Sequence, residues 1–175
     1  MTIDQREFRN VLGQFATGIA IVTASVDGNR IGTTISSFNS VSLDPPLVLF
    51  SIANKSLGLM HWKAAKAMTV FILGEDQTEL SNRFARAGGD KWAGLESAAT
   101  ANGSPALPGA IARFDCIPYA IYPGGDHEIF VCEVKSFTAA AKTLPLIFHA
   151  GKYRNLKSTD ASEAPPEVNM WLHGW

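Results

Sequence analysis

The stretch AIARFDCIPYAIYPGGDHEIFVCEVKSFTAA, residues 110–140, decides the fold class. Two runs rich in β-branched and aromatic residues, 110–123 and 127–140, flank the turn sequence GGD. Such residues favour strands, and glycine accepts the backbone angles of a tight turn. The pattern predicts a long antiparallel hairpin, and Asp126 and His127 at its tip suggest a role beyond reversing the chain.

The segments before this hairpin predict four further strands. A first hairpin is expected over residues 19–38, where Asp27-Gly28-Asn29 separates two β-branched runs. Asp44-Pro45-Pro46 interrupts the next extended run, because proline fixes φ and cannot donate to a sheet. Strands are therefore expected over residues 47–52 and 67–73.

Three helices are expected among these strands. Asp4 and Glu7 resemble a capping box ahead of an amphipathic helix that Gly18 can end. Residues 56–66 and 76–87 predict two more helices. Because most strands are joined antiparallel and helices are few, the chain is expected to be mainly β, as a closed or partly open barrel.

The remaining segments complete the domain plan. Residues 88–109 are rich in Gly, Ala and Ser and predict a long surface loop, and residues 145–156 predict one last strand. We expect one domain over residues 1–156 and a tail over 157–175. The Trp-rich end of that tail, Met170 to Trp175, is expected to dock near the active site and restrict access.

Composition excludes several classes of protein. The chain has 175 residues, a net charge of −1 and a pI near 6.4, which argue against a nucleic-acid partner. It has no apolar run of the roughly 20 residues that a membrane span needs, and no leader-like start, so a cytoplasmic protein is expected. Cys116 and Cys132 match neither a disulfide framework nor a metal spacing, and we expect both in the core and no metal.

Common catalytic motifs are also missing. No G-x-G or P-loop occurs, so a nucleotide must be held without these glycine-rich loops. Neither H-E-x-x-H nor G-x-S-x-G occurs, which removes the usual signatures of zinc proteases and α/β-hydrolases.

A hydroxyl-rich segment and a short polar motif remain as candidate ligand sites. The hydroxyls belong to Thr33, Thr34, Ser36, Ser37, Ser40 and Ser42. Those on one strand face can bond a phosphate or a ribityl chain, although Thr also favours strands and Ser also fills turns. Asn54, Lys55 and Ser56 follow at an expected strand end and helix start, where free N–H groups and a lysine favour an anion.

Five fragments together resemble a known family. They are SFNSVSLDPPLVLFSI (37–52), NKS (54–56), LSNRFA (80–85), GGDKWAG (88–94) and GGDHEIFVCEV (124–134). In this order and at these separations they resemble the flavin reductase-like proteins with an FMN-binding split barrel, over roughly residues 5–156. The pairing of SLDPP with GDH in one chain is the specific part of the resemblance.

The resemblance implies a homodimeric Greek-key split β-barrel with a few flanking helices, with FMN or FAD near the subunit interface. It implies an NAD(P)H:flavin oxidoreductase that transfers a hydride from NADH to flavin and supplies reduced flavin to a separate monooxygenase. NADH is favoured over NADPH because no arginine cluster for a 2′-phosphate is evident. Two alternatives stay open: a flavin-holding electron carrier on the same fold, and an oxidase of a small molecule such as a pyridoxamine phosphate.

The resemblance also implies roles for individual residues. The ribityl and phosphate groups would be held by Thr34, Ser36, Ser37, Asn54, Lys55 and Ser56, with Thr33 as a further hydroxyl. The turn Gly125-Asp126-His127 would lie beside the isoalloxazine and nicotinamide rings, and Phe148, His149 and Tyr153 are weaker candidates for walling the dinucleotide.

Chemistry supports a catalytic role for this turn. Hydride transfer needs two flat rings held in contact and shielded from water, and glycine lets a backbone approach such rings. His127 could donate a hydrogen bond to the nicotinamide carboxamide or to a flavin oxygen, and Asp126 could fix its tautomer. One departure is that Cys132 stands where the family commonly has glycine, so packing is expected to differ there.

Overall fold

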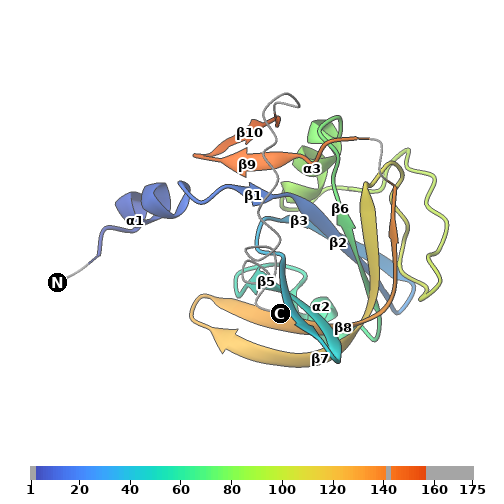
Figure 1. Ribbon diagram of the computed structural model, residues 1–175. Coiled ribbons are helices and arrows are strands. Elements are labelled where there is room, and N and C mark those ends of the chain that lie inside the picture. Colours follow the sequence, from blue (N-terminus) through green and yellow to red (C-terminus); the bar gives the residue numbers. More distant parts are fainter. Residues whose placement is uncertain (1–2, 141–142, 157–175) are drawn as a thin grey trace.

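The structure, a computed structural model, describes residues 3–140 and 143–156. Antiparallel strands are the main regular structure of this part of the chain, and they curl into an open barrel (Figure 1). The predicted docking of Met170 to Trp175 lies outside the described residues.

Within the described residues, the strands form two sheets. Seven strands build the main sheet in the order β3-β2-β6-β7-β8-β5-β4, and three short ones build a second sheet in the order β1-β9-β10. The strands are Thr17–Gly18 (β1), Ala20–Val26 (β2), Asn29–Ile35 (β3), Asn39–Leu43 (β4), Pro46–Ala53 (β5), Met68–Ile72 (β6), Ala112–Gly124 (β7), His127–Ala139 (β8), Ile147–His149 (β9) and Lys152–Arg154 (β10). The mainly β prediction is confirmed.

In the part of the chain that the structure describes, three short helices accompany the sheets: Gln5–Leu12 (α1), Leu59–Ala64 (α2) and Thr78–Ala85 (α3). The carboxylate of Asp4 accepts a hydrogen bond from the backbone N–H of Glu7 at 2.7 Å, so the predicted N-cap of α1 is confirmed. Its predicted end at Gly18 is wrong, because Gly13 caps the helix and Gly18 already pairs with β9.

The predicted long hairpin is β7 and β8, and it forms the centre of the main sheet. Residues 112–116 of β7 pair with β6, whereas residues 127–133 of β8 pair with β5. The pairing of β7 with β8 shifts register between Asp115 and Cys116 and again between Pro118 and Ala120. Such irregularities bend strands, and the hairpin bends strongly in Figure 1. One hairpin therefore joins both halves of the main sheet.

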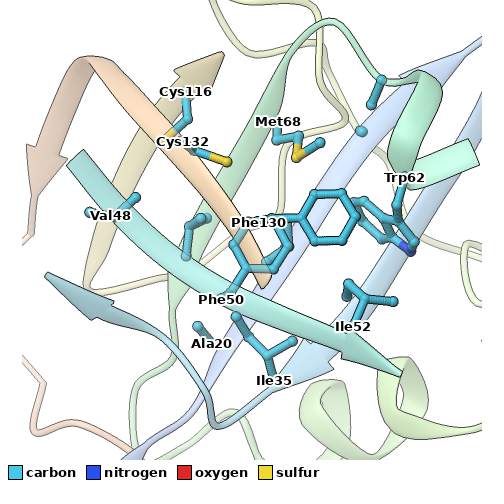
Figure 2. Close-up of a cluster of buried hydrophobic side chains, with 14 of the residues drawn as sticks. Ala20, Ile35, Val48, Phe50, Ile52, Trp62, Met68, Cys116, Phe130 and Cys132 are labelled. Carbon is cyan, nitrogen blue, oxygen red and sulfur yellow. The ribbon is translucent and has the colours of Figure 1, made fainter. Parts of the chain in front are cut away.

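The barrel interior is filled by apolar side chains from every strand of the main sheet except β4 (Figure 2). Phe50 and Phe130 stack at its centre, with ring centroids 5.4 Å apart. Trp62 of α2 is 2% exposed and covers one end. Cys116 and Cys132 are both buried there as free thiols, as predicted.

A second apolar cluster lies beneath α3 and the long loop. Trp92 packs edge-to-face on Phe84, with centroids 4.9 Å apart, and its Nε1 donates to the carbonyl of Arg30 at 3.1 Å. Gly32 of β3 faces this pair, and a Cβ there would lie 2.5 Å from Cε1 of Phe84. The predicted loop is confirmed, since residues 88–109 form turns and an isolated bridge.

A buried polar network fastens this loop to the sheet. Asp115 is 1% exposed and accepts hydrogen bonds from the hydroxyls of Thr69 (2.9 Å) and Ser136 (2.8 Å). The guanidinium of Arg113 lies 3.2 Å from the same carboxylate. Asn102 of the loop donates to the carbonyl of Met68 at 2.9 Å. These hydrogen bonds and the ion pair offset the free-energy cost of burying the Asp115 carboxylate.

The end of the described chain differs from expectation. Residues 145–156 hold two short strands, β9 and β10, instead of the single predicted strand. A turn at Ala150 and Gly151, both with positive φ, separates them and allows β10 to pair with β9.

Candidate active site

A cleft of about 300 Å³ opens where β3 ends, beside the ends of β5 and β8. Six predicted site residues line it: Thr33, Thr34, Ser36, Ser37, Ser56 and His127. Ile35, Ser51, Ile52 and Ala53 complete the wall. The fold thus brings the hydroxyl-rich exit of β3 and the histidine of the GGDH turn to one cleft.

Two of the cleft hydroxyls differ in what they can offer a ligand. The Thr34 hydroxyl donates its proton to the carbonyl of Ser81 at 2.7 Å, so it can only accept from a ligand. The Ser37 oxygen accepts from the backbone N–H of Ser51 at 2.9 Å, while its own contact to the Ser51 carbonyl is long, at 3.5 Å. Ser37 can therefore donate a hydrogen bond to an acceptor atom of a ligand, and Thr34 can accept one from a ligand hydroxyl.

Asn54 holds the GGDH turn instead of lining the cleft. Its side-chain amide donates to the carbonyl of Gly125 at 3.0 Å, and its backbone N–H donates to the carbonyl of Asp126 at 2.9 Å. Gly125 has a φ of +73°, which favours glycine at this position. The sequence marked Asn54 as a flavin ligand, whereas the structure gives it a part in fixing the turn that ends in His127.

Asp126 and His127 form a hydrogen-bonded pair at the tip of the hairpin. Nδ1 of His127 lies 2.7 Å from Oδ1 of Asp126. This hydrogen bond lowers the pKa of the Asp126 carboxyl, helped by the nearby charges of His127 and Lys55. The carboxylate thus favours a proton on Nδ1 and leaves Nε2 free of this bond. The predicted tautomer-fixing role of Asp126 has the geometry that it requires.

The NKS segment is arranged differently from expectation. The helix predicted from Ser56 begins at Leu59, and the backbone N–H of Ser56 donates to the carbonyl of Ala53 at 2.9 Å. The prediction of a helix N-terminus with free N–H groups at Ser56 is therefore wrong. Lys55 and the Ser56 side chain remain, at the edge of a second cavity beside the cleft.

Phe148, His149 and Tyr153 lie in the second sheet, away from the lining of the cleft. Phe148 and Tyr153 pack edge-to-face at 5.7 Å, and the Tyr153 hydroxyl donates to the side chain of Asn82 at 3.0 Å. Phe148 lines a groove of about 550 Å³ between α1 and the β9–β10 turn. Ser36 borders both this groove and the cleft, so the two hollows meet there.

Sequence reasoning missed the second cavity, which has a volume of about 470 Å³. It shares Thr33 and Ser56 with the cleft, and its cationic side chains are Arg30, Lys55, Arg86 and Lys91. The ammonium of Lys91 donates to the carbonyls of Gly32 (3.1 Å) and Phe84 (2.9 Å), and partial burial lowers its pKa. The fragment GGDKWAG carried the signal, but these cations come from separate segments of the chain.

Two features typical of other protein classes do not occur within residues 3–140 and 143–156. No group of three or more His, Cys, Asp or Glu side chains in this part of the chain could hold a metal ion. No helix in the same part has the length and apolar character needed to cross a membrane.

The fold is an open antiparallel barrel, and its cleft is lined by hydroxyls and by a histidine. These features define the class of protein, and the match to a sequence profile identifies the family. The profile of the flavin reductase like domain matches residues 12–157. The chain belongs to this family, and the predicted resemblance is confirmed.

Relatives of known activity agree with this assignment. The chain is 37% identical over 166 residues to the reductase subunit HsaB of a flavin-dependent monooxygenase from Rhodococcus jostii, covering 93% of this chain and 84% of that one. It is 41% identical over 150 residues to the FMN reductase (NADH) SmoA of Agrobacterium fabrum, covering 86% and 85%. The NADH:FAD oxidoreductase SgcE6 of Streptomyces globisporus, solved with NAD and FAD fragments, superposes with a TM-score of 0.85 at 29% identity, covering 92% and 99%.

Proposed function

We propose that the protein is an NADH-dependent flavin reductase that reduces FMN or FAD in the cleft and supplies the product to a separate monooxygenase. The observation that carries this is the convergence of Ser36, Ser37 and Thr34 with His127 on one cleft. The names of the relatives, an FMN reductase (NADH) and a reductase subunit of a monooxygenase, support the activity and the partner. A cytoplasmic location, where NADH is available, fits this proposal.

The residues of the cleft fit a flavin. Ser37 can donate to the ring or chain oxygens, Thr34 can accept from a ribityl hydroxyl, and Lys55 brings positive charge for a phosphate. Flavin supplies a hydride acceptor and NADH a hydride donor, so the protein needs mainly to align two rings. Asn54 and Asp126 hold His127, whose Nε2 can bond the nicotinamide carboxamide or a flavin oxygen.

The histidine tests this proposal. His127→Ala removes a hydrogen bond worth roughly 0.5–1.5 kcal/mol, or more if a partner stays unpaired, so kcat/KM for NADH is expected to fall several-fold to roughly a hundredfold. Flavin affinity is expected to change far less. The matched control is His61→Ala, because His61 is an exposed residue of α2.

Stopped-flow reduction of bound flavin by NADH measures this effect directly. Wild-type reduction rates at every NADH concentration in a folded, flavin-binding His127→Ala variant would show that the turn is not catalytic. Failure of the wild-type protein to oxidise NADH with any flavin would overturn the function itself. Dialysis against flavin-free buffer separates a reductase, which releases flavin, from an electron carrier, which stays yellow.

We also propose that the protein is a homodimer held partly by α1. Phe8, Val11, Leu12 and Phe15 form one face of this helix and its exit, and each is at least 52% exposed. In Figure 1, α1 stands away from the barrel. An eight-residue helix is marginal alone in water, so this apolar face needs a partner, and a second copy would also cover the groove beside the cleft.

Sedimentation equilibrium tests the dimer. Val11→Glu places a charge on the apolar face and is expected to give monomers, while Arg6→Glu on the opposite face is expected to leave the dimer intact. A monomeric wild-type protein, or an intact dimer in the Val11→Glu variant, would contradict this arrangement.

A further inference from the structure

The imidazole of His127 has little packing to fix its direction. Its partners on the two neighbouring strands are Ala53 of β5 and Gly124 of β7, which have a small side chain or none. The His127 side chain is 42% exposed, and the Asp126 carboxylate that pairs with it is 92% exposed. Water competes readily for a hydrogen bond between two such exposed groups. The direction of the imidazole therefore depends on how the backbone of β8 is held at this residue.

The next residue, Glu128, is held from the opposite face of the strand. Successive side chains of a strand point to opposite faces, and of these two residues only His127 lines the cleft. The carboxylate of Glu128 pairs with the ammonium of Lys63 on α2, with Nζ 2.5 Å from Oε1. The Glu128 side chain is 19% exposed, so water screens this ion pair less than it screens the pair of Asp126 and His127.

The helix that carries Lys63 is a firm anchor for this ion pair. Trp62, the residue before Lys63, is buried and belongs to the apolar cluster of the barrel interior (Figure 2). A buried aromatic side chain cannot shift without disturbing its close-packed neighbours. The ion pair therefore ties the start of β8 to the barrel core and limits how far the strand can rotate beneath His127.

A second attachment from the same segment holds the other side of the turn. Asn54 donates from its side chain to the carbonyl of Gly125 and from its backbone to the carbonyl of Asp126. Asn54 and Lys63 lie nine positions apart, at the two ends of the segment that joins β5 to α2 and forms most of α2. His127 thus lies between two attachments that this segment makes to the hairpin.

We propose that Glu128 is a positioning residue for hydride transfer, because its ion pair with Lys63 holds β8 so that the imidazole of His127 meets the nicotinamide carboxamide or a flavin oxygen. The inference rests on the proposed flavin reductase activity, in which His127 orients the reacting rings. Glu128 itself contacts neither ring, and its effect passes through the histidine. A misplacement of about 1 Å can lower an enzymatic rate about a hundredfold, so even a modest loosening of His127 is measurable.

Stopped-flow reduction of bound flavin at saturating NADH measures this effect. Glu128→Gln keeps the size of the side chain but removes its charge, and it is expected to slow the reduction about three- to tenfold without changing Kd for flavin. Lys63→Met is expected to have the same effect, whereas Lys63→Arg keeps the charge and is expected to retain most of the rate. The matched control is Glu133→Gln, because Glu133 also lies on β8 and pairs with a lysine, Lys135, but is farther from the turn.

The His127→Ala background decides whether Glu128 acts through the histidine. Adding Glu128→Gln there is expected to slow the reduction no further, because the imidazole that Glu128 positions is gone. An equal slowing in both backgrounds would overturn the inference. A wild-type rate in both Glu128→Gln and Lys63→Met, with or without a lower Tm, would also overturn it, by reducing the ion pair to a structural role. Failure of the wild-type protein to oxidise NADH with any flavin would instead overturn the proposed function.

Discussion

Gly32→Ala tests the packing of the second apolar cluster, because Gly32 faces the aromatic pair of Phe84 and Trp92 beside the cationic cavity. The new methyl would lie 2.5 and 2.7 Å from two ring carbons of Phe84 and 3.2 Å from Cζ2 of Trp92. Comfortable carbon contacts are about 3.5–4.0 Å, so the Phe84 ring must move by about 1 Å. Phe84 is completely buried and already packs on Trp92, so this movement disturbs the whole cluster.

Overpacking of this kind costs about 1–3 kcal/mol. For a domain of this size, that corresponds to a Tm lower by roughly 2–12 °C. Differential scanning calorimetry measures the shift, and Gly18→Ala is the matched control, because a Cβ there meets nothing within 4 Å. Equal Tm values for the two variants would refute the reasoning, since they would show that Phe84 and Trp92 yield without cost.

Three further predictions concern the turn, the buried carboxylate and the buried thiols. Asn54→Ala is expected to lower kcat with NADH several-fold while shifting KM for flavin less, measured by NADH oxidation, because the carbonyl of Gly125 loses its side-chain donor. Ser136→Ala is expected to cost about 1 kcal/mol of unfolding free energy in urea, and Asp115→Ala about 3–5 kcal/mol, because the latter leaves buried groups unpaired. Burial raises the pKa of Cys132 to about 12 from 9.0 and raises that of Cys116 as well, so the stability from their protonated state is present below pH 9 and is lost as pH rises toward 12. Between pH 8 and pH 10, urea unfolding of wild type should lose about 2–3 kcal/mol more than a Cys116→Ala/Cys132→Ala double variant.

Local sequence signals predicted the elements of this fold well. Alternating β-branched runs and turn residues located the hairpins at Asp27-Gly28 and at Gly125-Asp126, because both signals act within a few residues. The predicted end of α1 was wrong because Gly18 pairs with the distant strand β9. The single strand predicted over residues 145–156 was wrong because the turn at Ala150 and Gly151 was not recognised. The hydrophobic periodicity of a segment does not show which strand it will pair with.

The predictions of site residues succeeded and failed for the same reason. His127 and the hydroxyls of β3 were predicted and do line one cleft. The role of Asn54 in the turn and the grouping of Arg30, Arg86 and Lys91 were missed, because each requires knowing which segments the barrel brings together. A lysine or arginine in isolation most often indicates only solvated surface, and a cationic cavity becomes visible only in three dimensions.

The pairing of β5 with β8 has a consequence for synthesis of the chain on the ribosome. Ala53 pairs with His127, so β5 emerges roughly 70 residues before the strand that will cover its inner edge. At about 5–20 residues per second, that edge waits roughly 4–15 seconds with its apolar run PLVLFSI unpaired on one side. During this interval β4 protects only the other edge. The nascent chain is therefore exposed to edge-to-edge association until the GGDH hairpin arrives, and the turn that completes the active site also ends that exposure.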